Sequence, residues 1–541
     1  MAPLDRSSGK EALSQVTMDD NMDFNGTDLP PEKQGTVVDR RDMYRMGKQQ
    51  EFRRNFSFIP IFGFAAVLMM TWASVLSSAS YTLPNGGLPA MIWIYIVTLF
   101  GFGCAILTMA EMSSMAPTSG GQVSDILPQT SDSKNVSLIF DKYHWVSEFA
   151  PPGFQKLLSY LVGWFCVLGW QAATQVQGLI ALNDENYLPK PWHGVLLTIA
   201  AASVAVLFNS LFARKLPLLE GLVLILLVFG FFAVLIPLWV FAPRQPSSAV
   251  WTDWHQTSDW PSMGLAALVG FTGPIYALIG PDSAVHMAEE VRDASRTIPL
   301  AMVSTLVLNG ITGLIMAITF AYCIGPIEAA LQPQYNFAFI GTFYNATQSQ
   351  AGATVMTCII TTLTLCSAIS NIATASRQMF AFARDHGLPF ARVLSYVQPG
   401  LDIPLNAVLV CFICTVLLSL ISLGSVVTFN AILSIGVVAL LTSYLTSMGC
   451  ILLKRIRGEK LLPRRFDLGV PLGWFANVVG IVYILLAFIF AFFPLANHPT
   501  LETMNWASAV YGGVAIVATF YYIFYARHIY VPPVSRLAKD L

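Results

Sequence analysis

Long apolar segments alternate with short polar ones over most of the chain, from residue 55 to residue 530. Each apolar segment has about the 20 residues that a membrane-spanning helix needs. The pattern therefore predicts an all-α polytopic membrane protein with 12 transmembrane helices. They are expected at residues 56–80, 89–112, 154–182, 192–212, 217–242, 263–288, 299–325, 351–376, 405–423, 426–453, 472–494 and 506–530.

Polar residues dominate both ends of the chain. Residues 1–54 contain no apolar stretch of the kind found in signal peptides, so we expect a disordered tail there, and residues 531–541 form a shorter one. Of the 30 Lys and Arg residues, all but Lys190 and Arg244 fall in the tails and loops on one side of the twelve predicted spans. The positive-inside rule places that side, with both termini, in the cytosol.

The composition narrows the class of protein. Only 11% of the residues are charged, against roughly 25% in soluble domains, so a soluble multidomain enzyme is excluded. The 30 basic and 31 acidic residues balance, which leaves no field to hold nucleic acid. No P-loop, nucleophile-elbow or zincin motif occurs, so we expect neither ATP drive nor an enzyme. No metal or other cofactor is expected.

The sixth predicted span carries the clearest candidate chemistry. Gly273-Pro274 and Gly280-Pro281 lie seven residues apart, and Asp282 follows directly. These pairs predict a discontinuous helix, whose freed backbone groups transporters use to hold substrates and ions. A carboxylate at this depth costs about 2.5 to 3.5 kcal/mol and suits a cationic or zwitterionic ligand. Capping of the second half-helix is the alternative role for Asp282, compatible with the first.

Other polar and aromatic residues could join this site. Trp72 and Tyr276 could offer aromatic faces to an ammonium group, or could simply pack. The small residues beside Trp72 fit substrate contact or close helix packing, and a glutamine of the third span fits inward contact or an interhelical hydrogen bond. The candidate substrate-binding residues are Trp72, Ala73, Ser74, Gln171, Gly273, Pro274, Tyr276, Gly280 and Asp282.

Two further features concern protons and gating. Glu289 and Glu290 are followed at once by Arg292, and we expect these three residues in a gating ion pair at the cytosolic mouth. His286 could shuttle a proton at physiological pH, although a histidine near a helix end is more often merely solvated.

Three motifs together resemble the fungal amino acid/choline transporter family of the amino acid, polyamine and organocation superfamily. They are AEMSSMAPTSGGQ at residues 110–122, DSAVHMAEE at 282–290 and ASRQMFAFARDHGLP at 375–389, and the resemblance runs from about residue 50 to 530. It implies a LeuT-like fold: a 5+5 inverted repeat plus two accessory helices, with spans one and six broken. It also implies substrate contacts at residues 72–74 and 273–282, and uptake of choline, 4-aminobutyrate (GABA), polyamines or amino acids with protons. Span one lacks a Gly or Pro at its presumed break.

One segment departs from the family pattern. In relatives the Gly-Gly-Gln motif runs straight into an aromatic stretch like that at residues 143–151, but here residues 123–142 intervene. They begin Val-Ser and end in Lys, which GTAAGT and AAG can encode, as at intron borders. Twenty codons also preserve the reading frame. We therefore suspect a retained intron, with a true cytosolic insertion as the alternative.

These observations predict a plasma-membrane secondary transporter that imports a small amine-bearing nutrient, most simply by proton symport. The partners expected are that substrate and the lipid bilayer, with the proton gradient in place of a cofactor. The alternative is a nutrient sensor that binds such a ligand with little transport. Substrate, coupling ion and the choice between plasma and vacuolar membrane stay open at this point.

Overall fold

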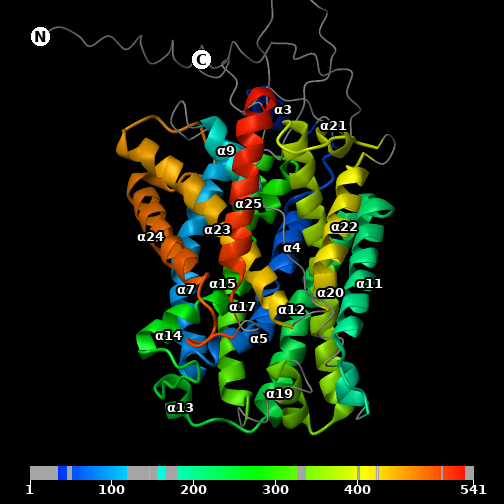
Figure 1. Cartoon of the computed structure of the whole chain (residues 1–541), viewed down its shortest axis with the longest axis vertical. Helices are drawn as coiled ribbons and strands as arrows, with labels where there is room; N and C mark the ends of the chain where they lie inside the picture. Colours follow the sequence, from blue (N-terminus) through cyan, green and yellow to red (C-terminus); the bar gives the residue numbers. More distant parts are fainter. Residues whose placement is uncertain are drawn as a thin grey trace, which may run out of the picture.

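The computed structural model describes residues 35–45, 52–117, 145, 155–164, 179–184, 186–325, 337–398, 402–421, 423, 426–500 and 504–530. Within these ranges the chain is a bundle of helices (Figure 1). Extended pairing there is confined to isolated bridges, among them Phe56 with Val291.

Nine helical segments of the described part are long and apolar enough to cross a membrane. They are Phe58–Ser77 (α4 Phe58–Met69 and α5 Thr71–Ser77), Gly87–Met115 (α7), Pro191–Ser210 (α11), Ala213–Phe241 (α12 Leu216–Phe241 with a preceding turn), Ala294–Cys323 (α17), Gln350–Arg384 (α20), Ile435–Ile456 (within α23, Val426–Ile456), Gly469–Phe490 (α24) and Ala507–Ile529 (α25 Ala507–Tyr521, a π-helical turn Tyr522–Ala526, α26 Arg527–Ile529). All nine lie where the hydropathy pattern predicted spans.

Two shorter apolar segments occupy the positions of the sixth and ninth predicted spans. They are Met263–Leu278, which contains α14 (Met263–Val269) and α15 (Thr272–Leu278), and Leu405–Leu420, within α22 (Leu405–Ile421). The third predicted span is described only at α9 (Gln155–Trp164) and at residues 179–184. The protein is thus an all-helical membrane protein.

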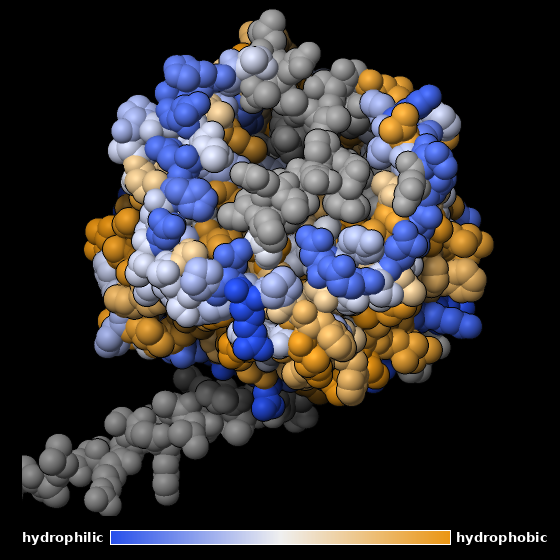
Figure 2. All heavy atoms as spheres, turned by 90° about the horizontal axis from the view of Figure 1, so that it is seen from below, coloured by the Kyte–Doolittle hydropathy of each residue, from blue (hydrophilic) through white to orange (hydrophobic). Residues whose placement is uncertain are grey.

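The outer flank of the bundle is apolar, as contact with lipid requires. On α12, exposed Leu218, Leu222, Ile225 and Phe229 recur at helical spacing, while Leu227 faces inward. Figure 2, the view from below Figure 1, shows hydrophilic side chains gathered on that end and hydrophobic ones around the flank. The bundle therefore has an apolar flank and, at the end seen in Figure 2, a polar face.

The two ends of the bundle carry different short elements (Figure 1). One end, called here the α3 end, carries α3 (Val37–Arg45), α9 and α21 (Ala391–Leu394). The opposite end, called the α13 end, carries α13 (Ser247–Trp251), α14 and α19 (Ala338–Thr347). A short helix, α6 (Ala79–Thr82), follows α5.

Helix α3 differs from the disordered tail expected for residues 1–54. Its buried Asp39 accepts hydrogen bonds from the backbone N–H groups of Asp293 and Ala294, at 2.9 and 3.0 Å, and so caps α17. Arg54 adds an ion pair to the same carboxylate, with 3.2 Å between nitrogen and oxygen. Composition alone does not reveal this docking, because Asp39 finds its partners about 250 residues away.

Candidate substrate site and gate

The sixth span is interrupted at the second of its two Gly-Pro pairs. Helix α15 ends at Leu278, Ile279 is extended, and Gly280 has φ +114° before α16 (Ser283–His286) begins. The first pair, Gly273-Pro274, lies in the first turn of α15, where proline is well tolerated. It follows the two turn residues, Gly270 and Phe271, that separate α14 from α15. The span therefore reverts to helix only after Asp282.

The first span is interrupted too, at Met70, which adopts a left-handed conformation with φ 34° and ψ 47° between α4 and α5. No Gly or Pro signals this break. Side chains from other spans accommodate it: Ser367 of α20 donates to the Leu68 carbonyl at 2.8 Å, and Asn309 of α17 donates to the Ala66 carbonyl at 3.0 Å. Ser74 donates to the Met69 carbonyl at 2.9 Å. Tertiary hydrogen bonds thus fix this interruption.

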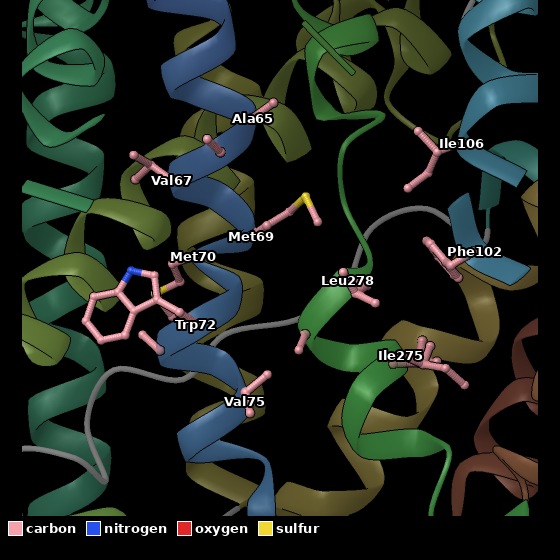
Figure 3. Packing of buried hydrophobic residues seen from close by; sticks show 14 of the residues in the cluster. Ala65, Val67, Met69, Met70, Trp72, Val75, Phe102, Ile106, Ile275 and Leu278 are labelled. Carbon is pink, nitrogen blue, oxygen red and sulfur yellow. The ribbon is translucent and has the colours of Figure 1, made fainter. Parts of the chain in front are cut away.

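The two interruptions pack against each other. A Cβ atom on Gly280 would lie 2.7 Å from Cδ2 of Leu68, and its φ of +114° favours glycine. The Thr71 hydroxyl donates to the Ala277 carbonyl at 2.7 Å and links the breaks directly. Figure 3 shows Met69 of α4 extending toward the segment that follows Leu278. Irregular backbone from two spans is thereby gathered at one place inside the bundle.

Asp282 lies beside these interruptions and is 3% exposed. Its side chain makes no capping hydrogen bond to α16. Instead, the hydroxyl of the buried Tyr444 on α23 donates to its Oδ1, and Nε2 of His286 lies 3.7 Å from its Oδ2. Three titratable groups from two elements are therefore buried together. Such a carboxylate can bind an ammonium group or exchange a proton.

The Trp72 side chain contacts α12. Its indole N–H donates to the Leu227 carbonyl at 3.1 Å, and its ring packs edge-on against Phe231, 6.1 Å away, both on α12. Figure 3 shows the indole on the side of α5 away from Leu278. The structure therefore favours the packing interpretation of Trp72.

The other candidate residues are placed as follows. Ala73 is fully buried within α5. Gly273 lies against α6, because a Cβ there would be 2.5 Å from Oγ1 of Thr82. Tyr276 is half-buried on α15. Gln171 lies outside the described residues. The structure thus brings together the breaks, Ser74, Gly280 and Asp282, with Trp72 turned away.

Glu289 and Glu290 both form ion pairs, but with cations other than Arg292. Glu290 pairs with Arg377 at 3.0 Å and Glu289 with Arg384 at 3.4 Å, both arginines belonging to α20. The expectation that Arg292 supplies the positive charge was wrong. Its backbone N–H donates to the Phe56 carbonyl and its exposed side chain donates to the Arg54 carbonyl, both at 2.9 Å. These two hydrogen bonds join Arg292 to the segment before span one.

A second buried cluster holds the α3 end together. Glu111 of α7 is fully buried and pairs with Arg455, and with Arg464 at 2.9 Å. Ser114, one turn on, accepts the backbone N–H groups of Arg465 and Phe466, each at 2.9 Å. The described part of the first motif (residues 110–117) and the motifs at 282–290 and 375–389 thus all contribute contacts at this end.

Many secondary transporters have discontinuous helices in two membrane spans, which together hold substrates and ions. The interruptions in spans one and six, with a carboxylate beside them, resemble this arrangement. The profile of the amino acid permease family matches residues 62–516, and the chain belongs to this family. A Macrophomina phaseolina protein whose name describes an amino acid/polyamine transporter is 30% identical, over 83% of this chain and 96% of its own. Two Saccharomyces cerevisiae proteins, the choline transporter and the GABA-specific permease, are each 26% identical, over 87% and 93% of this chain and 81% and 87% of theirs. The family is one of transporters, not enzymes.

Proposed function

We propose that this protein is a secondary active transporter that imports a small amine-bearing nutrient by alternating access, in symport with protons. The observation that carries the proposal is the contact between the two interrupted spans, with Asp282 buried beside it. A LeuT-like 5+5 inverted repeat with two accessory helices agrees with interruptions in spans one and six. The two broken spans would then hold the substrate between the repeats.

The names of the relatives point to the chemistry of the substrate. Choline, GABA, amino acids and polyamines all carry a cationic nitrogen. The Asp282 carboxylate follows the break in span six directly, and Tyr444 donates to it. An ammonium or quaternary nitrogen would replace or join this donor when the site opens. We therefore assign Asp282 to recognition of the positive end of the substrate.

The same proposal includes an orientation. In the described part, Arg377, Arg455 and Arg464 lie at the α3 end, in the ion pairs described above. Arginine and lysine residues are enriched on the cytosolic side of membrane proteins, so we assign the α3 end to the cytosol. The membrane that we infer is the plasma membrane, where import serves nutrition.

The test is uptake of labelled choline, GABA and a mixed amino-acid and polyamine panel in permease-deficient yeast. The full chain and a chain without residues 123–142, which lie outside the described residues, are compared side by side. Accumulation of one substrate against its gradient supports the proposal and identifies the class. Stoichiometric binding without accumulation would instead indicate a sensor.

Asp282→Asn is the sharpest variant for the substrate site, because it removes the charge and keeps the shape. We expect uptake of a cationic substrate to fall about tenfold or more, the usual effect of losing a charged partner from a buried site. Surface expression should stay near that of the unchanged chain. Asp253→Asn, an exposed change at the α13 end, is the matched control. Unaltered uptake by Asp282→Asn would remove this residue from the site.

A further inference from the structure

Glu220 is a buried acid that the substrate site does not use. It lies near the start of α12 and is 1% exposed. A Cβ atom on Gly63 of α4 would come within 2.7 Å of the Glu220 carbonyl oxygen, so the backbones of spans one and five nearly touch there. Its side chain reaches Ser370 on α20, the eighth span. Glu220 thus occupies the junction of three spans.

Half of this carboxyl group has a hydrogen-bonding partner. Oε1 accepts the Ser370 hydroxyl at 2.8 Å, whereas Oε2 is buried and has no hydrogen-bond partner within the described residues. Buried polar atoms are nearly always hydrogen-bonded, so an orphaned oxygen calls for an explanation. A bound proton is the smallest ligand that would neutralise it.

Among the described residues, no cation forms an ion pair with Glu220, and Arg214 and Lys215 lie in the turn that precedes α12. Helix α4 contributes no titratable residue, and α20 contributes Cys366 and Ser370. The nearest cation along α20, Arg377, is two turns beyond Ser370 and is bonded to Glu290 and to Asn209 of α11. A buried carboxylate without a cation is costly, and binding a proton removes that cost.

The position of Glu220 connects its proton to the gate. Helices α4 and α20 are joined by the Ser367–Leu68 hydrogen bond, and α16 is followed by the glutamates that pair with α20. Alternating access requires the α3 end to open, which separates α4 from α20. Water would then reach the carboxyl group and accept its proton.

We propose that Glu220 is the proton-binding site that couples opening of the α3 end to the proton gradient. The inference rests on the proposed symport and names the group that carries it. One proton binds to a carboxylate oxygen while α4, α12 and α20 are packed. The same proton leaves to water, as hydronium, when they separate. No other bond is made or broken.

The test uses the full chain with Glu220→Gln, which mimics the protonated acid and keeps the Ser370 contact. Glu459→Gln, at an exposed glutamate that is 46% accessible, is the matched control. The first measurement is infrared difference spectroscopy of the purified proteins between acidic and alkaline pH. We expect a carboxylic-acid band in the unchanged chain and the control that is missing in Glu220→Gln. A band unaltered by Glu220→Gln would overturn the proton site.

The second measurement compares accumulation with exchange, using labelled choline, or labelled GABA if that is the probe that the unchanged chain accumulates. Glu220→Gln should lose about tenfold or more of proton-driven accumulation, within the normal range of thermodynamic coupling, while counterflow exchange stays within about twofold. Accumulation equal to the unchanged chain, with the same pH dependence, would overturn the coupling role alone. If the unchanged chain accumulates none of the panel, the proposed function fails, and the infrared result still decides whether Glu220 binds a proton.

Discussion

The two ends of the bundle are closed by different chemistry. At the α3 end, buried ion pairs join elements far apart in the chain: Glu289 with Arg384, Glu290 with Arg377, and Glu111 with Arg455. The side chains of Glu289 and Arg384 are 0% and 1% exposed, so these charges are removed from water. If such a pair is broken, two buried charges are left without partners, which costs free energy of folding.

The α13 end is closed by aromatic rings and neutral hydrogen bonds. The indole N–H of Trp93 donates to the Trp251 carbonyl at 3.2 Å, and the two rings pack edge-on 5.9 Å apart. The Trp251 indole in turn donates to the Tyr322 hydroxyl at 2.9 Å. Trp260 packs against Phe493 in a tilted arrangement, with the ring centroids 5.9 Å apart. These contacts involve no ionised group.

This difference in contacts predicts how each end of the bundle responds to substitutions and to pH. Ion pairs in a low dielectric are strong, directional and sensitive to protons, so the α3 end should switch sharply between closed and open. Aromatic contacts lose strength gradually as area is exposed, and pH barely affects them. We therefore expect charge substitutions and pH to act at the α3 end, and ring truncations to act at the α13 end.

Breaking a buried pair at the α3 end should have the largest effect. Arg384→Ala leaves the fully buried Glu289 without this cation, and removing one partner of a buried pair costs about 3 to 5 kcal/mol. We expect a large fall in melting temperature, or loss of monodisperse protein, in fluorescence-detected size-exclusion chromatography. The double variant Arg384→Met with Glu289→Leu should recover much of that loss. An unchanged melting temperature for Arg384→Ala would contradict charge closure.

Truncating a ring at the α13 end should cost less. Trp251→Ala removes an aromatic pair worth about 0.5 to 1.5 kcal/mol and a hydrogen bond worth about 1 kcal/mol, so we expect a loss of about 2 kcal/mol from these two contacts. Trp251→Phe keeps the ring contact and loses only the donation to Tyr322. Melting curves of the two variants separate the contributions. Equal losses would show that the hydrogen bond, and not the ring, holds this end.

The two interrupted spans show what the sequence could and could not predict. The break in span six could be predicted, because the backbone preferences of Gly280 and Pro281 are intrinsic to these residues and need no partner. The local sequence did not predict the break at Met70 in span one. The carbonyl groups just before Met70 accept hydrogen bonds from Asn309 and Ser367, which are more than 200 residues away. Local pattern carries no information about such partners.

The ion pairs of Glu289 and Glu290 were predicted only in part, for the same reason. The two acids were recognised because charge is rare in apolar segments, but the nearest cation in sequence, Arg292, was the wrong partner. Arg377 and Arg384 are seven residues apart and so share a face of α20, which was an available signal. Glu220 carried little signal because it is a single polar residue in an apolar span, and Tyr444 because it is one of several hydroxyl-bearing residues in α23. The role of each depends on neighbours from other spans.

The smallest expected effect, and the one that separates the two ends most directly, concerns pH. Burial alone would raise the pKa of the Asp39 carboxyl, but Arg54 and backbone N–H groups, those of Asp293 and Ala294 among them, outweigh burial and lower it. A carboxyl whose pKa is lowered on folding contributes stability above its unfolded pKa of about 3.9, and this stability is lost as pH falls through the folded value. Asp39→Asn should therefore cost about 1 kcal/mol at neutral pH, as loss of a helix cap does. The difference in stability from the unchanged chain should disappear below about pH 4.

Melting curves over this pH range provide the measurement. Trp251→Phe, which changes no ionisable group, should show a difference in stability that is independent of pH. A constant difference for Asp39→Asn as well would mean that charge does not hold α3 in place, and that the two ends differ less than their contacts indicate.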